Sequence, residues 1–202
     1  PDNLKLQFDT KNALIERFDS HYFESVDSYS RLLLSTMFYE RFSIYKYILI
    51  YQLDAFVFYD KLEYFCDMGY DYIGAPWISG FCEYTNLKRK VLYVGNGGLS
   101  LRNIQGCIRA LTNNIDILAK YSKRNEDVFF ALCDGLDFKV APKEVALEFA
   151  FEREVCKSFE LNNRNIPFGC HAWEKYNFNF WKKYISKFGY QLEDYLIENK
   201  NE

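Results

Sequence analysis

The chain has 202 residues, of which 49% are hydrophobic and 19% aromatic, so it can bury a sizeable core and lacks a disordered composition. Its formal net charge is −3, which excludes the global basic field that attracts nucleic acid. The length favours one domain. We divide it into an N-terminal helical part (residues 1–44), a core (45–173) and C-terminal helices (174–202).

The cysteines and the apolar runs bear on the cellular compartment. No cysteine forms a Cys-x-x-Cys pair or has zinc-finger spacing with a histidine, so buried thiols in a reducing cytosol are the simplest interpretation. No signal peptide is recognisable, and no apolar run approaches the roughly 18–20 residues of a membrane span. We therefore expect a cytoplasmic protein.

The first half of the chain predicts helices that alternate with short strands. Residues 13–18 fit a strand and a helical turn equally well. Ser25 or Ser28 can cap a helix that runs to about residue 42. After it we expect strands at 45–51, 55–58 and 70–74, a helix at 61–68 capped by Asp60 and ended by Gly69, and a polar loop at 78–90.

The second half continues this alternation and ends in helices. We expect strands at 91–94, 99–102 and 138–141, and helices at 103–111, 116–121 and from 125 to about 135. Residues 144–159 are undecided, and 166–173 form a loop. The amphipathic helices expected at 174–187 and 191–198 most often pack on the core, while contact with a partner or with the inner face of a membrane stays an alternative.

The strand at 45–51 ends abruptly in Gln52-Leu53-Asp54. In α/β folds the chemistry lies at the carboxyl ends of strands. Hard cations prefer carboxylate oxygen, so Asp54 is a candidate metal ligand with Gln52 as its polar neighbour. Taken alone, the motif fits an aspartate that caps a turn at least as well.

The segment Gly95-Asn96-Gly97-Gly98 holds three glycines in four residues, which allow positive φ and a close approach of the backbone to a ligand. The amide of Asn96 can recognise hydroxyl groups. The spacing matches neither a Walker loop nor a dinucleotide fingerprint. A hairpin turn is the competing interpretation.

Two further motifs contain groups that can exchange protons. Glu126 and Asp127 stand at an expected helix start, where acids commonly stabilise the helix dipole; alternatively, one of them accepts a proton from an attacking hydroxyl. His171 lies in a loop, and imidazole is a common ligand of divalent metals. The other histidine, His21, is expected to be structural.

The order of these motifs resembles a known family. The blocks are Gln-x-Asp after a strand, Tyr-Asp-Tyr-Ile-Gly-Ala-Pro-Trp at 70–77, Gly-Asn-Gly-Gly-x-Ser-Leu-Arg at 95–102, Asn-Glu-Asp-Val-Phe-Phe at 125–130 and Pro-Phe-Gly-x-His-x-Trp at 167–173. Together they resemble a bacterial family of glycosyltransferase-like proteins of unknown function. More distantly, the pattern is similar to GT-A enzymes such as the Fringe and β-1,3-galactosyltransferase group.

The resemblance implies an α/β fold of the GT-A type, a Rossmann-related mixed sheet flanked by helices, with residues 45–173 as the catalytic core. It implies a metal-assisted, inverting transfer of a sugar from a nucleotide-sugar, a UDP-sugar being favoured, to a saccharide or glycoconjugate in polysaccharide biosynthesis. Asp127 would be the base, with Glu126 orienting it or holding an acceptor hydroxyl. Asp54 and His171 would bind Mn²⁺ or Mg²⁺. The donor- or acceptor-binding residues would be Gln52, Asp54, Trp77, Asn96, Gly97 and Gly98.

Two departures from the GT-A pattern define the rival hypotheses. Gln52 stands where the first aspartate of an Asp-x-Asp motif is often found, which removes one charged ligand. The usual first strand near the N-terminus is not recognisable, so we expect an abbreviated N-terminal half or a truncated member. The main rival is therefore a non-catalytic carbohydrate- or nucleotide-binding module. A phosphate-ester hydrolase is less favoured because no second acidic or histidine cluster for a two-metal site is recognisable.

Overall fold

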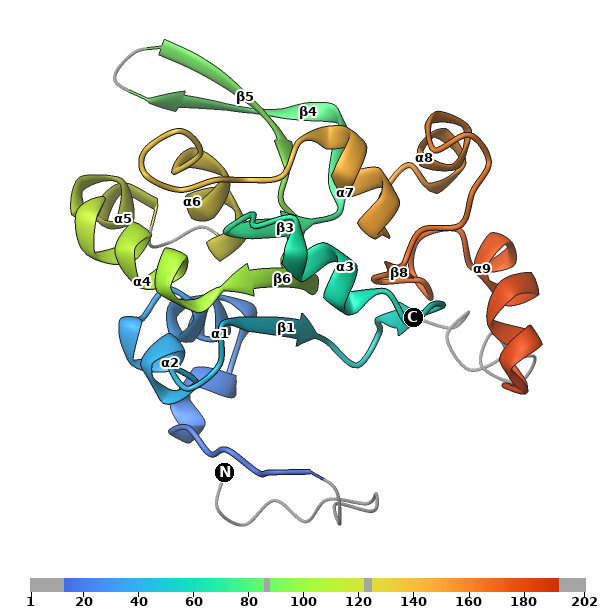
Figure 1. The fold of residues 1–202 in the computed structure, drawn as a ribbon, viewed down its shortest axis with the longest axis horizontal. Coiled ribbons are helices and arrows are strands. Elements are labelled where there is room, and N and C mark those ends of the chain that lie inside the picture. Colours follow the sequence, from blue (N-terminus) through green and yellow to red (C-terminus); the bar gives the residue numbers. More distant parts are fainter. Residues whose placement is uncertain (1–12, 86–87, 122–124, 193–202) are drawn as a thin grey trace.

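The computed structural model of the chain describes residues 13–85, 88–121 and 125–192. Within this part, three small sheets are surrounded by helices, so the expected mixed α/β class is confirmed (Figure 1). In the same part, no helix has the length and apolarity needed to cross a bilayer.

The central sheet contains β1 (Tyr47–Tyr51), β6 (Leu99–Asn103) and β3 (Tyr72–Gly74), with β6 in the middle. β6 pairs antiparallel with both neighbours, so β1 and β3 run in the same direction. The carboxyl ends of β1 and β3 therefore lie at the edge of the sheet where β6 begins.

The register fixes which residues meet at this edge. Tyr51 pairs with Leu99, and Gly74 pairs with the next residue of β6. The backbone N–H of Gln52 donates to the carbonyl of Gly98 at 2.9 Å, which extends the ladder beyond β1. The start of the Gln52–Asp54 motif and the glycine-rich segment are thus brought side by side by backbone pairing.

The second sheet is mixed, and the third is a hairpin. β8 (Gly169–Cys170) pairs antiparallel with β2 (Phe56–Val57) and parallel with β7 (Ala150–Phe151). The hairpin is formed by β4 (Pro76–Thr85) and β5 (Lys88–Val94). Because β7 and β8 carry Glu152 and His171 at their ends, the second sheet brings the late part of the chain to the end of β1.

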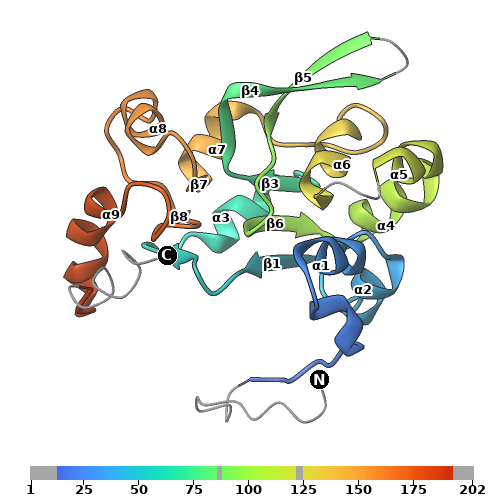
Figure 2. The ribbon, with the colours of Figure 1, turned by 180° about the vertical axis from the view of Figure 1, so that it is seen from behind.

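Helices surround the sheets: one group lies at each end of the molecule, and α3 and α7 lie between the two groups (Figures 1 and 2). The end containing α1 and α2 also holds α4 and α5, and the opposite end holds α8 and α9. The helices are η1 (Ser20–Phe23), α1 (Val26–Leu33), α2 (Thr36–Arg41), α3 (Leu62–Asp67), α4 (Ile104–Asn113), α5 (Ile115–Tyr121), α6 (Glu126–Leu132), α7 (Lys143–Phe149), α8 (Val155–Leu161), α9 (Phe178–Ile185) and η2 (Ser186–Phe188).

Side-chain caps explain several of these boundaries. Ser25 caps α1, and its own N–H bonds to the hydroxyl of Ser28 at 2.8 Å, which completes a capping box. Asn103 caps α4 by accepting from the N–H of Gly106 at 2.8 Å. The single helix expected to run to residue 42 is divided, because Ser35 caps a second helix, α2.

Other sequence expectations are corrected by tertiary pairing. Residues 78–90 were expected to form a polar loop, but most of them belong to the β4–β5 hairpin, which buries Ile78 and Leu92. Residues 138–141 form no strand and supply only one bridge, from Val140 to Tyr72. α3 begins after Lys61 without a side-chain cap, so Asp60 does not cap it.

The later segments also differ in part from expectation. The undecided residues 144–159 form parts of α7, β7 and α8, and the expected loop at 166–173 contains β8. The helix expected at 174–187 begins at Phe178. The last expected helix, 191–198, lies almost wholly outside the described residues.

Candidate functional site

A cleft of about 620 Å³ opens at the edge where β1 and β3 end and β6 begins. All residues singled out from the sequence line it, although they are spread over more than a hundred positions: Gln52, Asp54, Trp77, Asn96, Gly97, Gly98, Glu126, Asp127 and His171. His21 is exposed and is not among the residues that line the cleft; its Nδ1 lies 2.8 Å from Oδ1 of Asp19.

His171 is held from both sides of its ring. Its Nδ1 lies 3.0 Å from Oε2 of Glu152. Its Nε2 lies 3.1 Å from Oδ1 of Asp54 and 3.0 Å from Oε1 of Gln52. Burial disfavours the protonated ring, but the hydrogen bond and charge of Glu152 and the charge of Asp54 outweigh it and raise the pKa of His171 above its usual value.

These contacts test whether the residues present fit a divalent cation. A carboxylate oxygen of Asp54 and the amide oxygen of Gln52 both contact Nε2 of His171, and such nitrogen and oxygen donors suit first-row divalent ions. Glu152 has the place of an outer partner that orients a ligating imidazole. Among the described residues, no group of three or more His, Cys, Asp or Glu side chains is placed to hold a metal. Asp54, Gln52 and His171 are the described side chains whose donor atoms suit such an ion.

A second part of the cleft lining includes one partner of a buried ion pair. The side chain of Arg102 is 0% exposed, and its Nη2 lies 2.8 Å from Oε1 of Glu126. Its Nη1 donates to the hydroxyl of Tyr39 at 3.0 Å, and its Nε donates to Ser100 at 3.0 Å. The hydroxyl of Ser30 donates to the second oxygen of Glu126 at 3.2 Å. Both oxygens of Glu126 therefore accept hydrogen bonds from side chains inside the protein.

Asp127 follows directly and has a different environment. Its Oδ1 accepts from the backbone N–H of Val128 at 2.7 Å. Burial and the neighbouring charge of Glu126 raise the pKa of Asp127 to about 7, although the Val128 hydrogen bond and Arg102 act against them. Asp127 is thus a carboxyl group that lines the cleft and exchanges its proton near neutral pH.

The glycines of the Gly95–Gly98 segment have a different structural role from the one expected from the sequence. The left-handed φ falls on Asn96 (52°) and not on Gly95, Gly97 or Gly98. A side chain at Gly95 would strike the Trp77 ring. Likewise, one at Gly97 would strike the Glu126 carboxylate, and one at Gly98 the His171 ring. The glycines therefore make room for site side chains. The hairpin interpretation is wrong, because β5 and β6 belong to different sheets.

Asn96, within the glycine-rich segment, is hydrogen-bonded to the side chain of Trp77. The indole Nε1 of Trp77 donates to Oδ1 of Asn96 at 2.9 Å, and the amide nitrogen of Asn96 donates to the carbonyl of Ala75 at 3.4 Å. Asn96 thereby fixes the tryptophan ring at the wall of the cleft, in addition to any contact with a ligand.

Several cleft residues were missed by the sequence analysis. Tyr29 and Ser30 come from α1, where the sequence shows only an amphipathic helix. Arg153 and Lys175 add positive charge to a cleft that is otherwise acidic, and both lie against the Tyr176 ring, at 5.5 and 5.3 Å. No local motif marks these residues. Of the four, only Lys175 is close in sequence to a predicted site residue, four positions after His171.

In a comparison with known proteins, a family model matches most of the chain. The family model described as a protein of unknown function (DUF5672) covers residues 12–171, a span that includes all the site residues singled out from the sequence. No curated protein and no solved structure matches the chain.

Proposed function

The chain belongs to the DUF5672 family of proteins of unknown function, and from this premise we propose that it is a metal-assisted glycosyltransferase. It would move a sugar from a nucleotide-sugar, with a UDP-sugar favoured, to a saccharide or glycoconjugate acceptor. The observation that carries the proposal is that one cleft holds two chemically different acidic groups: Asp54 beside His171, and the buried carboxyl of Asp127.

The donor belongs on the side of Asp54 and His171. When a sugar leaves a nucleoside diphosphate, negative charge grows on the diphosphate. A divalent cation held by Asp54 and His171, with Gln52 as a neutral third donor, would stabilise that charge. Arg153 and Lys175 line the same cleft, and their fixed positive charges suit phosphate oxygens.

The acceptor belongs on the side of Asp127. A hydroxyl is a poor nucleophile until a base accepts its proton, and a base is most effective when its pKa lies near the working pH. The pKa of about 7 gives Asp127 this property. Arg102 holds Glu126 in place, and the charge of Glu126 helps to keep the pKa of Asp127 raised. A base on the face opposite the leaving diphosphate would invert the anomeric carbon.

The fold supports the same proposal at a coarser level. β1 and β3 both direct their carboxyl ends at the cleft, which is where α/β enzymes bind nucleotides. Trp77 and Tyr176 line the cleft and offer flat apolar faces to a sugar ring. A GT-A-like fold, a role in bacterial polysaccharide assembly and a cytoplasmic location are parts of this proposal.

Calorimetric titration with UDP and with GDP, with and without Mn²⁺, tests it. We expect binding of a nucleoside diphosphate that Mn²⁺ strengthens. Asp54→Asn should remove the Mn²⁺ effect, whereas Asp60→Asn, an exposed aspartate outside the cleft, should keep it. Failure of both nucleotides to bind would sink the transferase proposal. Binding without release of UDP or GDP from any nucleotide-sugar would favour the non-catalytic module instead.

A further inference from the structure

A second pocket, separate from the cleft, is formed by α3 with the residues before it, the end of α7 and the segment between α8 and β8. Its volume is about 620 Å³, within the range of roughly 300–1,000 Å³ that is common for small-molecule sites. No described residue lines both this pocket and the cleft. We call it the α3 pocket, and its lining includes Tyr59, Tyr64, Glu148, Asn162, Asn163 and Asn165.

Aromatic rings contribute apolar surface to the α3 pocket. Phe65 and Phe168 line it and are almost fully buried, with ring centroids 5.5 Å apart, so they form a fixed wall. Tyr59 is 45% exposed and Tyr64 is 50% exposed, so both tyrosines keep ring surface open to solvent. A tyrosine ring combines a flat apolar body with a polar tip. Such rings suit the C–H faces of sugar rings.

Asparagine side chains that follow α8 give the pocket hydrogen-bonding groups. Asn162 is 9% exposed, and its amide nitrogen donates to the carbonyl of Asn165 at 2.9 Å. Asn163 has a left-handed φ of 54°, which asparagine adopts more readily than most residues. Among the hydrogen bonds between described residues, none involves the amide oxygen of Asn162 or the side chains of Asn163 and Asn165. These amides therefore have donors and acceptors for a ligand.

The charged side chains of the pocket lining are one lysine and one glutamate, both exposed. Nζ of Lys61 lies 5.7 Å from the centre of the Tyr59 ring. Oε2 of Glu148 accepts from the hydroxyl of Tyr64 at 3.3 Å, and this carboxylate has further lone pairs that can accept from hydroxyl groups. Because each charge lies beside a tyrosine and the two have opposite sign, the lining favours neither a strongly acidic nor a strongly basic ligand.

From this combination we propose that the α3 pocket binds an uncharged oligosaccharide. The rings of Tyr59 and Tyr64 would stack on the apolar faces of sugar rings. The asparagine amides and Glu148 would exchange hydrogen bonds with sugar hydroxyls, which both donate and accept. An acidic glycan suits the pocket less well, because it would bring negative charge to Glu148. This proposal does not depend on the glycosyltransferase proposal, because the pocket and the cleft share no described lining residue.

Calorimetric titration of the full chain with neutral hexasaccharides tests the proposal. The probes are maltohexaose, cellohexaose, xylohexaose and N-acetylchitohexaose, with hexagalacturonate as an acidic oligosaccharide of equal length. We expect at least one neutral probe to bind, and hexagalacturonate to bind more weakly. Tyr59→Ala combined with Tyr64→Ala should weaken binding roughly tenfold through the loss of two ring contacts. Asn163→Gly combined with Asn165→Ala should weaken it about fivefold or more, since glycine keeps the left-handed backbone while the amides are removed.

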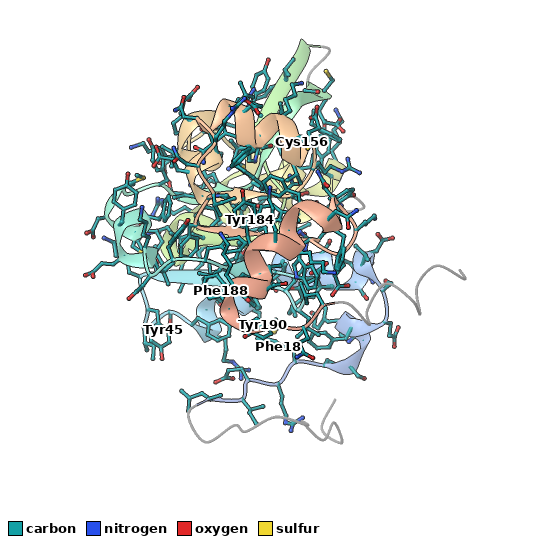
Figure 3. All side chains as sticks on the ribbon, turned by 90° about the vertical axis from the view of Figure 1, so that its right-hand side faces the viewer. Phe18, Tyr45, Cys156, Tyr184, Phe188 and Tyr190 are labelled. Carbon is teal, nitrogen blue, oxygen red and sulfur yellow. The ribbon has the colours of Figure 1, made fainter. Side chains whose placement is uncertain are left out.

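The matched control is Tyr45→Ala combined with Tyr190→Ala. These two tyrosines, labelled in Figure 3, are 52% and 58% exposed and line neither the α3 pocket nor the cleft. The control should bind the neutral probe like the unchanged chain. Absence of binding by all four neutral probes, tighter binding of hexagalacturonate, or an equal loss in the control would overturn the proposal. So would binding that Trp77→Ala abolishes and the Tyr59 and Tyr64 changes leave intact, because the saccharide would then occupy the cleft.

Discussion

Two groups of charged side chains lie at the cleft, and they differ in how far they are exposed to solvent. On the buried side (Arg102, Glu126 and Asp127), the Arg102 side chain is fully buried, and its partner Glu126 is 7% exposed. On the open side (Asp54, Glu152 and His171), the Asp54 side chain is 41% exposed, and its partner His171 is 13% exposed. One side is thus a rigid charge network enclosed by protein, and the other is a charge cluster that solvent and ligands can reach.

The difference teaches how one small cleft can support two kinds of chemistry. On the buried side, burial and Glu126 raise the pKa of Asp127 to about 7, which suits proton transfer. On the open side, Glu152 and Asp54 fix the imidazole of His171 and raise its pKa, so a divalent cation that binds Nε2 has to displace a proton there. Environments that give neighbouring titratable groups different properties commonly separate roles within an active site.

Removal of Arg102 should lower the free energy of unfolding more than any other change to the two sides of the cleft. Arg102→Met leaves Glu126 buried without its cation, so we expect a loss of about 3–5 kcal/mol in the free energy of unfolding, measured by urea denaturation. Adding Glu126→Gln should recover part of the loss. As a control, Arg164→Met breaks only an exposed pair with Glu160 and should cost about 0.5 kcal/mol or less. A loss from Arg102→Met as small as that of the control would mean that the buried side is not a stabilising network.

The adjacent glycines allow each side to be disturbed separately. Gly97→Ala would press on Glu126 and Arg102, which have no room to move, so unfolding free energy should fall by about 1–3 kcal/mol. Gly98→Ala would press on the His171 ring, which lines the cleft and can shift into it. We therefore expect Gly98→Ala to weaken Mn²⁺-dependent nucleotide binding with a smaller change in stability. The reverse pattern would show that the rigid and the open sides have been assigned wrongly.

The raised pKa of Asp127 gives a smaller effect with a defined sign. Its pKa in the folded chain (about 7) lies above the ordinary value of 3.8, so the neutral form contributes stability below pH 4 that is lost as pH rises through 7. Asp127→Asn avoids this loss. Relative to the unchanged chain, the variant should be more stable at pH 8 by on the order of 1–2 kcal/mol, and the difference should shrink toward pH 4. Asp60→Asn should show no such trend; a pH-independent difference for Asp127→Asn would contradict the raised pKa.

Local sequence signals predicted the parts of the fold that local interactions determine. The caps at Ser25 and Asn103 and the strand that ends at Tyr51 were predicted, because side chains within a few residues fix them. The β4–β5 hairpin was missed because its apolar residues are mixed with polar ones, and burial against the core decides its structure.

In the candidate site, too, the local motifs could be predicted, whereas the contacts between distant residues could not. Each motif was recognisable, but their meeting in one cleft depends on the antiparallel register that places Gln52 beside Gly98. Arg102 gave no sign of its role, since arginine is mostly exposed and its partner Glu126 lies 24 positions away. Glu152 fell in a segment whose structure the sequence left undecided, and its contact with His171 arises only from the pairing of β7 with β8.

The central claim is that the open side binds the nucleotide while Asp127 accepts the proton. It is tested most directly by comparing Asp127→Asn with the unchanged chain in two assays: calorimetric affinity for the nucleoside diphosphate with Mn²⁺, and release of that diphosphate from a panel of UDP- and GDP-sugars with saccharide acceptors. We predict that the release rate falls about 10²–10⁴-fold and that nucleotide affinity is nearly unchanged. A comparable loss in both assays, or an unchanged release rate, would contradict the claim.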